Sequence, residues 1–348
     1  MSTAVPGSRA ISEVRRAVRT LLDEVSLHSG QLAVAVSGGA DSLALAAATA
    51  QLADRPAHRR RLTLHGLIVD HRLQPGSADV AERAAKQLHG LGFAHVRVLE
   101  VDVRGPGGPE AAARRARYAA LRGARPAEDS LVLLGHTRDD QAETVLLGLG
   151  RGSGPRSIAG MRRLDPPWAR PLLDVPRSVT AEACADLGLD VWQDPHNADP
   201  GFARVRLRRE VLPLLEDVLR GGVAAALART ATQLREDSDA LDVIAERVLV
   251  RARRCPEGRL PDAGCPEGVL PGTELEVGEL AAEPPALRRR VLRRWLLEAG
   301  VAELTDGHLR SADALIGEWR GQGGVWLPGG LEVSRVRGRL TVSGRVSG

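Results

Sequence analysis

Short apolar runs alternate with longer amphipathic segments through the first half of the chain. Four runs rich in valine and leucine have the length of buried strands, at 31–36, 62–69, 95–101 and 130–135. The three segments between them carry the apolar spacing of helices, at 42–53, 77–92 and 109–124. Strands that alternate with helices predict an α/β fold with a doubly wound parallel sheet. In such a sheet the ligand lies beyond the carboxyl ends of the strands.

Helical periodicity dominates the last third of the chain. One long amphipathic helix, two shorter helices and a strand-and-turn pattern are predicted there, at 223–252, 284–300, 306–319 and 325–342. We therefore expect two domains: one over 1–215 that holds the α/β sheet, and a mainly helical one over 216–348 that ends in a short strand-rich segment. A proline- and glycine-rich stretch at about 253–273, in which "CPEG" occurs twice, predicts a loop without chemistry.

Composition indicates an ordinary globular protein with a sizeable core, since 43% of its 348 residues are hydrophobic and 26% are charged. No run approaches the roughly 18 to 20 apolar residues that cross a bilayer, and the start lacks the order of a secretory signal. We expect a cytoplasmic protein with no membrane partner. The three cysteines form no CxxC pair, which argues against a disulfide framework, a zinc ribbon and an iron–sulfur cluster. The net charge of +4 is small, but its arginines gather in clusters that suit a polyanion or, equally, a solvated helix face.

Glycines follow the first predicted strand, in the string "SGGADS" at 37–42. They allow a tight turn in which backbone N–H groups approach an anion, and the next helix points its positive end to the same place. This arrangement binds a phosphate without a lysine. Asp41 would repel that phosphate unless a divalent cation lay between them, and magnesium is the natural bridge. A plain strand-to-helix turn with a serine or aspartate cap is the alternative.

Further polar residues follow the second and fourth predicted strands; they are Asp70, His71, His136, Asp139, Asp140 and Glu143. In a helix that begins near Asp139, the three acidic residues of this group lie on a single turn. Acids at a helix N-terminus also stabilise the helix by about 0.3 to 1 kcal/mol each, so a purely structural role stays open. A lone histidine is likewise as often structural as functional.

The string "SGGADS" is similar to the signature of the N-type ATP pyrophosphatases, or PP-loop enzymes. These enzymes cleave ATP between its α- and β-phosphates to form an adenylate, on a Rossmann-like sheet. Four further segments resemble the tRNA(Ile)-lysidine synthases in order and spacing: "EAAARRARY", "GHTRDDQAETVLLGLGRGSG", "RPLLDVPR" and "DPHNADPGFARVRLRREVLPLL". The chain departs from that family at Gln74, where arginine is frequent, and at Val205, where asparagine is usual.

The resemblance implies a two-step reaction on the wobble cytidine of an isoleucine tRNA with the anticodon CAU. ATP adenylates the oxygen at carbon 2 of the base and releases pyrophosphate; the ε-amine of free lysine then displaces AMP and forms lysidine. A tRNA thiolase of the same superfamily is the alternative enzyme, although the cytidine thiolases use CxxC pairs. A tRNA-binding protein with an inactive nucleotide site is the non-enzymatic alternative. The second domain resembles a tRNA-binding domain of the family, and the oligomeric state stays open, a homodimer included.

Weighed against this reaction, the residues above and several arginines of the resembling segments have expected roles. ATP contacts the loop and the end of the second strand, at Ser37, Gly38, Gly39, Ala40, Asp41, Ser42, Asp70 and His71. Magnesium is held by Asp41 and Asp140, and lysine by Asp139 and Glu143. The catalytic set, in which arginines offset charge on phosphorus, is Asp41, Asp140, Arg114, Arg117 and His136. A glycine turn and a basic segment contact tRNA phosphates, through Arg151, Arg204, Arg206 and Arg208.

Overall fold

The structure is a computed structural model that describes residues 8–53, 62–74, 76–105, 108–152, 154–195, 199–253 and 269–344. The chain divides into two compact units, Met1–Thr232 and Gln233–Gly348. Most of the predicted CPEG loop falls on residues 254–268, which lie outside the described residues. Within the described ranges, no helix combines the length and the apolar character that crossing a membrane requires.

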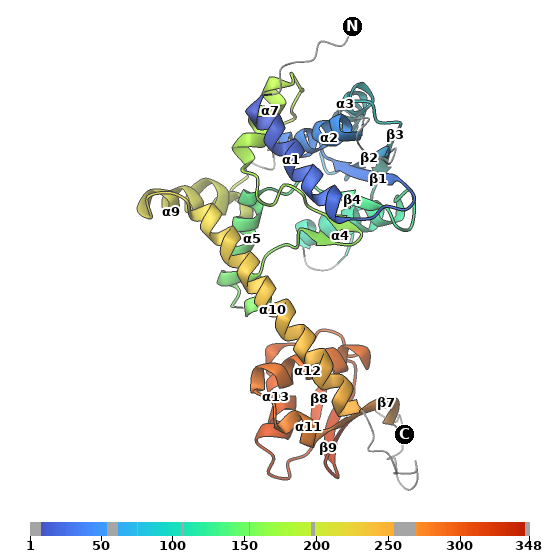
Figure 1. Ribbon diagram of the computed structural model, residues 1–348, viewed down its shortest axis with the longest axis vertical. Helices are drawn as coiled ribbons and strands as arrows, with labels where there is room; N and C mark the ends of the chain where they lie inside the picture. The colour runs from blue at the N-terminus through green and yellow to red at the C-terminus, as the bar shows by residue number, and fades with distance from the viewer. Residues whose placement is uncertain are drawn as a thin grey trace. The chain divides into compact units, whose positions relative to one another are not determined.

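The first unit is built on a six-stranded sheet with the strand order β3-β2-β1-β4-β6-β5 (Figure 1). Its strands are β1 (Gln31–Val36), β2 (Thr63–Asp70), β3 (His95–Glu100), β4 (Leu131–Leu133), β5 (Leu164–Asp165) and β6 (Trp168–Ala169). The first four strands and β6 pair in parallel, whereas the short edge strand β5 pairs antiparallel with β6. The predicted doubly wound α/β sheet is thereby confirmed.

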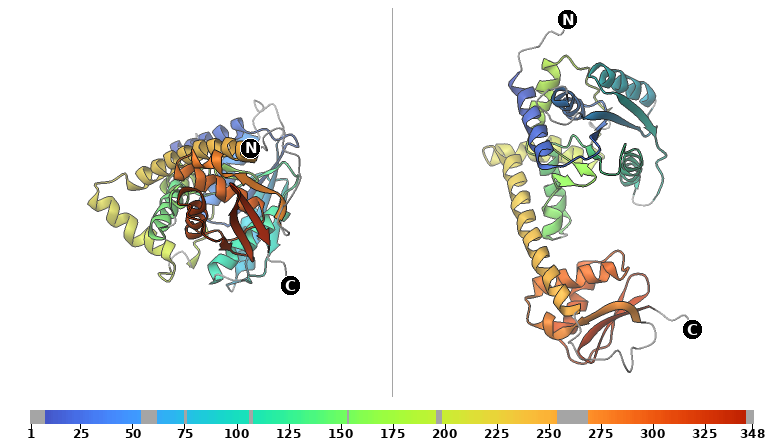
Figure 2. Two further views of the ribbon diagram at one scale, coloured as in Figure 1. Left: turned by 90° about the horizontal axis from the view of Figure 1, so that it is seen from below. Right: turned by 45° about the vertical axis from the view of Figure 1, so that its right-hand side comes forward.

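Helices cover both faces of this sheet (Figures 1 and 2). The described helical segments that begin in the first unit are α1 (Arg9–Glu24), α2 (Ala40–Ala53), α3 (Ser77–Gly90), α4 (Gly108–Gly123), α5 (Arg138–Gly150), α6 (Pro155–Ile158), α7 (Arg177–Asp186), α8 (Ala203–Arg206), the π-helical turn η2 (Leu207–Val211), α9 (Leu212–Val218) and α10 (Val223–Arg253). Alternate residues of β1 explain the two layers. Leu32 and Val34 pack in a core with α1, α2 and α7, whereas Ala33 and Ala35 pack on the opposite face with Leu121 of α4. β1 is therefore buried on both faces, as central strands of parallel sheets are.

The second unit is a four-stranded antiparallel sheet packed against helices (Figure 2). Its strand order is β7-β10-β9-β8, and its elements beyond α10 are β7 (Val269–Glu276), α11 (Val277–Ala281), α12 (Pro285–Glu298), α13 (Asp306–Gly317), β8 (Val325–Leu327), β9 (Leu331–Val336) and β10 (Arg339–Gly344). Trp295 of α12 is fully buried in its core, with Leu249 of α10 and Leu340 of β10. This confirms the predicted helices and closing strands.

The end of the predicted loop at about 253–273 overlaps a strand of this unit. β7 begins at Val269, inside the stretch that composition predicts as a loop. Pairing with β10 stabilises a strand there although the local sequence contains proline and glycine. β7 lies at the edge of the sheet, where a proline is tolerated because one side of the strand needs no hydrogen-bond donor.

Candidate active site

The loop at 37–42, between β1 and α2, is closed from inside by its last serine. The Ser42 hydroxyl donates a hydrogen bond to the carbonyl oxygen of Gly39 (2.9 Å) and accepts one from the backbone N–H of Ser37 (3.1 Å). Ser42 is buried. Gly38 has a φ of +84°, a left-handed conformation that suits glycine. Ser42 therefore fixes the loop, while Ser37 lines the cavity beside it.

Two distant segments hold this loop from outside. A Cβ added at Gly135, just beyond β4, would lie 3.0 Å from backbone atoms of Asp41 and Ser42. The absence of a side chain at Gly135 thus lets the chain pass close to the first turn of α2. On the other side, the backbone N–H of Trp192 donates to the carbonyl oxygen of Gly38 over 3.0 Å. The loop is consequently tied to the end of β4 and to the segment around Trp192.

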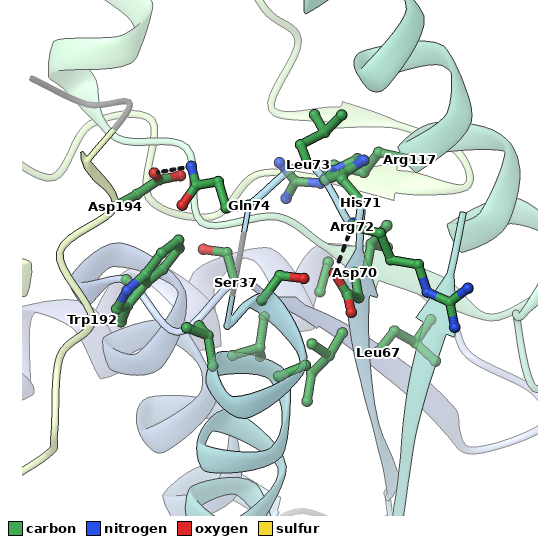
Figure 3. A pocket seen from close by; sticks show the side chains of 18 residues that line it. Ser37, Leu67, Asp70, His71, Arg72, Leu73, Gln74, Arg117, Trp192 and Asp194 are labelled. Atoms are coloured by element: carbon green, nitrogen blue, oxygen red, sulfur yellow. Dashed lines mark hydrogen bonds between the residues drawn. The ribbon is translucent and has the colours of Figure 1, made fainter. Parts of the chain in front are cut away.

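A cavity of about 330 Å³ opens beside the loop, at the carboxyl ends of β1 and β2 (Figure 3). Its walls come from the two strand ends, the segment after β2, the first turns of α3, one residue of α4 and two residues of the segment 192–194. In Figure 3, Trp192 stands on one side, Leu67 and Asp70 stand on the other, and Ser37 lies between them. A partly apolar cavity of this size beside an anion-binding loop suits a nucleoside whose phosphates extend onto the loop.

Gln74 and Asp194 meet at this cavity. The Nε2 of Gln74 donates to Oδ1 of Asp194 over 3.0 Å and joins the segment after β2 to the segment that carries Trp192 (Figure 3). Asp70 is buried, and its carboxylate accepts a hydrogen bond from the backbone N–H of Arg72 (2.9 Å). Asp70 therefore shapes the turn that brings the next residues to the cavity wall.

Two histidines with buried, unpartnered nitrogens lie at the strand ends. Among the residues that the structure describes, the Nδ1 atoms of His71 and His136 have no hydrogen-bond partner. Burial lowers the pKa of His71, and Arg117 lowers it further. Burial also lowers the pKa of His136 to about 3, against the opposing charge of Asp140. Both imidazoles are therefore neutral at pH 7, and each can accept or donate a hydrogen bond there.

Arg114 and Arg117 project from α4. The Arg114 guanidinium lies over the ring of Tyr118, 4.9 Å from its centroid, and donates to the Tyr118 hydroxyl over 3.3 Å. Tyr118 packs edge-on against Trp168 of β6, with 4.7 Å between the ring centroids. Arg117 lines the cavity beside His71. The two arginines thus place positive charge on the side of the sheet where the cavity opens.

Four carboxylates gather where α2 and α5 begin; this carboxylate cluster is Asp41, Asp139, Asp140 and Glu143. Asp140 caps its own helix, because its Oδ2 accepts hydrogen bonds from the backbone N–H (2.8 Å) and the hydroxyl (2.9 Å) of Thr137. Asp139 instead accepts a hydrogen bond from the backbone N–H of Arg177, the first residue of α7 (2.8 Å). Glu143 is completely buried.

Two arginines bind the carboxylate cluster. Arg177 donates from Nη2 to Oδ1 of Asp140 (2.6 Å) and from Nη1 to Oε1 of Glu143 (3.3 Å). Its Nε lies 3.4 Å from Oδ2 of Asp41. Arg208 donates from Nε and Nη2 to the two oxygens of Glu143, at 2.8 and 3.2 Å. Three of the four carboxylates thus contact the two guanidiniums, and the fourth, Asp139, contacts the backbone of Arg177. The formal charges of the cluster and the two arginines sum to two negative charges when all four carboxylates are ionised.

Burial and charge oppose one another within the cluster. Burial raises the pKa of Asp41, although the Thr180 hydroxyl and Arg177 act against it. Burial acts in the same direction on Asp140, but Arg177 and the backbone N–H of Thr137 outweigh it and lower the pKa of Asp140. Burial would lower the pKa of Arg177, but the carboxylates raise it further above neutrality. Arg177 is therefore a fixed positive charge.

Comparisons with known proteins identify the family. Residues 11–215 match the family model of the PP-loop domain, and residues 275–341 match that of the TilS substrate binding domain. A tRNA(Ile)-lysidine synthase of Rhodococcus erythropolis is 54% identical over 341 residues, which cover 97% of this chain and 96% of that protein. One of Mycobacterium tuberculosis is 56% identical over 315 residues, which cover 90% of this chain and 88% of that protein. The chain belongs to the tRNA(Ile)-lysidine synthase family.

A solved structure agrees with the fold of this lysidine synthase family member. The U34-tRNA thiolase NcsA of Methanococcus maripaludis, described with its [4Fe-4S] cluster, matches with a TM-score of 0.52 and 19% identity. The match covers 65% of this chain and 80% of that one. At this identity the likeness shows the fold alone. The sequence relatives confirm the family that the sequence motifs predict.

The residues predicted to bind ATP or to act in catalysis fall into two neighbouring groups. Those that line the cavity are Ser37, Gly39, Asp70, His71 and Arg117. Those of the carboxylate cluster are Asp41, Asp139, Asp140 and Glu143. Gly38, Ala40 and Ser42 belong to the loop between the two groups, and the charges of Arg114 and Asp140 both act on His136. The structure therefore assembles these residues at one end of the sheet.

The predicted tRNA-binding arginines do not share a face. Residues 203–211 form α8 and η2. In a helix, side chains two residues apart point in different directions, so Arg204, Arg206 and Arg208 cannot line one face. Arg206 makes an exposed ion pair with Glu210 of η2, whereas Arg208 binds the carboxylate cluster. Arg204 is half-buried on α8, and Arg151 is exposed at the C-terminal end of α5.

Sequence reasoning missed three residues that shape this site. Arg177 ends the motif "RPLLDVPR", and Thr180 follows it on α7, where its hydroxyl donates to Oδ1 of Asp41. Trp192 forms one side of the cavity. The motif was a signal for Arg177, but nothing in the pattern of a single arginine or threonine indicates a contact with Asp41. Cys184, the one cysteine within the described ranges, is buried and free.

Proposed function

We propose that this chain is an ATP-dependent ligase that joins free lysine to carbon 2 of the wobble cytidine in the isoleucine tRNA with the anticodon CAU. ATP adenylates the oxygen on that carbon and pyrophosphate leaves; the ε-amine of lysine then attacks the carbon and AMP leaves. The observation that carries this proposal is the 54% identity, over nearly the whole chain, to the tRNA(Ile)-lysidine synthase of R. erythropolis. The cavity and the carboxylate cluster supply sites for its substrates.

We assign ATP to the cavity and the loop beside it. The base and ribose occupy the cavity between Trp192 and Leu67, and the phosphates lie on the backbone N–H groups of the loop 37–42. Ser42 contributes by holding the loop in shape, since its own hydroxyl is engaged with Gly39 and Ser37. Fixed donors of this kind need no rearrangement when charge develops on the phosphates.

Asp41 and Asp140 fit a divalent cation. They reach from two different helices to one guanidinium, that of Arg177, so a single positive charge already bridges them. Bound magnesium would offset charge on the phosphates as pyrophosphate departs. The chain's own contribution is to fix one oxygen of each carboxylate, on the Thr180 hydroxyl and on Thr137.

We assign the wobble cytidine to the side of the site where His136 and the α4 arginines lie. The base leaves the anticodon loop, which costs less than leaving a duplex. His136 is neutral with Nδ1 unpartnered among the described residues, so it can exchange one hydrogen bond with the base. Arg114 and Arg117 place positive charge where the attacking oxygen and the α-phosphate meet. Tyr118 holds Arg114 in this orientation.

We assign to Asp139 the binding of a positively charged amine of free lysine. This carboxylate is half-buried, and one of its oxygens is held by the backbone N–H of Arg177. Glu143, the other predicted lysine ligand, is completely buried and already bound by Arg177 and Arg208. Glu143 therefore acts through Arg208, which it orients beside the lysine site. The tRNA backbone is contacted by Arg151, Arg204 and Arg206 and by the second unit.

The proposal is tested with purified protein, ATP, magnesium, free lysine and a CAU isoleucine tRNA transcript. The nucleosides of the tRNA are then weighed by mass spectrometry. We expect a cytidine heavier by one lysine minus water, formed only when lysine is present. Asp41→Asn should fold normally and lose tRNA-dependent exchange of pyrophosphate into ATP. An unchanged tRNA and intact ATP would contradict the proposal. A sulfur-containing nucleoside, formed when a sulfide donor replaces lysine in the mixture, would replace it with a thiolase.

A further inference from the structure

The carboxylate oxygens of Asp41 and Asp140 are divided between two threonines and the Arg177 guanidinium. Each of the two carboxylates proposed to hold magnesium has one oxygen committed to a neighbouring threonine. Oδ1 of Asp41 accepts a hydrogen bond from the Thr180 hydroxyl, and Oδ2 of Asp140 accepts two hydrogen bonds from Thr137. The two other oxygens, Oδ2 of Asp41 and Oδ1 of Asp140, both contact the guanidinium of Arg177. The oxygens of the two carboxylates that accept no hydrogen bond from a threonine are therefore the ones that Arg177 contacts, with Arg208 3.5 Å from Oδ1 of Asp140 as well. A cation that binds both carboxylates through these oxygens takes the place of Arg177.

We propose that Arg177 is a built-in counter-cation for the pair Asp41 and Asp140, which a divalent cation displaces from these two oxygens when it binds. This inference rests on the proposed magnesium role of the two aspartates. Within the described ranges no group of three histidine, cysteine, aspartate or glutamate side chains is arranged to hold a metal ion. Arg177 instead supplies the positive charge that keeps the two carboxylates, from α2 and α5, beside one another.

The contacts of Arg177 differ in strength in a way that suits displacement. Its Nη2 is 2.6 Å from Asp140, whereas its Nε is 3.4 Å from Asp41, at the limit of a hydrogen bond. Its third contact, with the buried Glu143, involves a different nitrogen, Nη1. The contact with Glu143 is therefore the one that could still hold Arg177 once a cation has taken the two aspartate oxygens. The unbalanced charge of the cluster also matches a divalent cation better than a second monovalent one.

The displacement makes Arg177 a determinant of metal affinity rather than a metal ligand. A fixed positive charge beside two carboxylates disfavours a second cation, so the wild-type chain binds metal more weakly than the carboxylates alone would. Arg177 also keeps the two carboxylates ordered when no metal is bound, because a carboxylate removed from water without a partner raises the free energy of the folded state. Removing Arg177 should therefore strengthen metal binding, which is the opposite of what removing a supporting residue would do.

The test measures Mn²⁺ binding to the full chain without nucleotide. The electron paramagnetic resonance signal of the Mn²⁺ that stays free reports how much is bound. Wild type, Arg177→Gln, Arg208→Gln and Asp41→Asn are compared, with Mg²⁺ as a competitor. We expect Arg177→Gln to bind Mn²⁺ about tenfold more tightly than wild type, and Asp41→Asn to lose this site. Arg208→Gln is the matched control, because it also removes a guanidinium from the cluster. Among the described contacts, Arg208 binds chiefly Glu143 (2.8 Å) and lies 3.5 Å from Oδ1 of Asp140, whereas Arg177 contacts both aspartates and is 2.6 Å from that oxygen. Arg208→Gln should therefore tighten binding much less.

Three outcomes separate the possibilities. Equal or weaker binding by Arg177→Gln, with the Asp41-dependent site intact in wild type, would overturn the inference and leave the magnesium proposal standing. An equal gain in Arg208→Gln would also overturn it, because general electrostatics would then explain both. If no variant shows an Asp41-dependent site, the magnesium role fails and the inference fails with it. If Arg177→Gln does not fold, Arg177→Lys replaces it in the test. One ammonium cannot bridge both oxygens, so we expect an intermediate gain in Mn²⁺ affinity.

Discussion

The carboxylate of Asp139 accepts a hydrogen bond from the backbone N–H of Arg177 over 2.8 Å. Arg177 is the first residue of α7, and the residue before it, Pro176, provides no side-chain cap. A residue of α5 thus supplies to α7 the acceptor that a capping side chain supplies within a single helix. Asp139 consequently couples the start of α7, and the Arg177 side chain, to the N-terminus of α5.

Substitutions at Asp139 should separate two roles of this residue: the hydrogen bond to the start of α7 and the binding of lysine by its negative charge. Asp139→Asn keeps an oxygen that accepts the hydrogen bond, so its free energy of unfolding should stay near that of wild type. Asp139→Ala loses the acceptor and should cost about 1 kcal/mol. Both variants lose the carboxylate, and both should raise the KM for lysine more than the KM for ATP. Urea unfolding gives the free energy of each variant, and steady-state kinetics at varied lysine and ATP give the two KM values of each. A KM for lysine that is unchanged in Asp139→Asn would remove the lysine assignment.

Gly135 sets how closely the end of β4 approaches the loop 37–42. A methyl group there would lie 3.0 Å from backbone atoms of Asp41 and Ser42, which is too close without a shift of the first turn of α2. Gly135→Ala should therefore weaken ATP binding about tenfold, equivalent to about 1.4 kcal/mol. Isothermal titration with a non-hydrolysable ATP analogue measures the change.

The matched control for this substitution is Gly123→Ala at the end of α4. A methyl group at Gly123 meets no described heavy atom within 4 Å, so this variant should bind the analogue like wild type. Unchanged affinity in Gly135→Ala would mean that the loop accommodates the methyl group without moving Asp41.

The residues of the cavity and the cluster differ in how far sequence could predict them. The strand β1 and the helix α2 are apolar almost throughout, so their pattern alone predicted a buried strand followed by a buried helix. Asp139, Asp140 and Glu143 could be placed on one turn because helical spacing is local. Arg177 could not be placed beside Asp41, because the two are 136 residues apart and meet only through the packing of α7 on α2.

Burial decides the contacts of residues that sequence spacing alone does not separate. The spacing that put Glu143 on the turn with Asp139 could not tell that its side chain is completely buried. Similarly, the alternation of Arg204, Arg206 and Arg208 with the apolar residues Val205 and Leu207 does not show that this segment is helical. In the helix, Arg208 binds the carboxylate cluster while Arg206 stays exposed. In both cases the deciding quantity is tertiary contact, which a single sequence does not contain.

Glu143 should therefore behave as a structural carboxylate. Its two oxygens bind Arg208, and Arg177 contacts one of them. Glu143→Gln removes the negative charge and leaves two guanidiniums short of a partner, at a cost of about 3 kcal/mol in the free energy of unfolding. Urea unfolding should rank Glu143→Gln well below Asp139→Asn.

A double-mutant cycle with Arg208→Gln isolates the pair within this network. The double variant should recover part of the stability lost in Glu143→Gln, because Arg208 is then no longer left unpaired. A stable Glu143→Gln with a raised KM for lysine would instead place Glu143 in direct contact with the substrate.

His136 should make the first unit less stable as the pH falls. Its pKa is about 3 in the folded protein and near 6.5 in the unfolded chain, so between these values the unfolded chain binds a proton that the folded protein excludes. Stability contributed by the neutral imidazole is therefore complete above pH 6.5 and decreases toward pH 3. The slope is about 1.4 kcal/mol per pH unit for this one group.

The free energy of unfolding at pH 7.0 and 5.5 gives this slope for wild type and for His136→Gln. The glutamine cannot take up the proton, so the variant should lose less stability than wild type between the two pH values, by about 1 kcal/mol. Adenylation by the wild-type enzyme should show no titration of His136 in this range, because a group with a pKa of about 3 is already deprotonated at both ends of it. An equal slope in the variant would mean that His136 takes up its proton in the folded state, and the neutral imidazole assigned to the base would then be wrong.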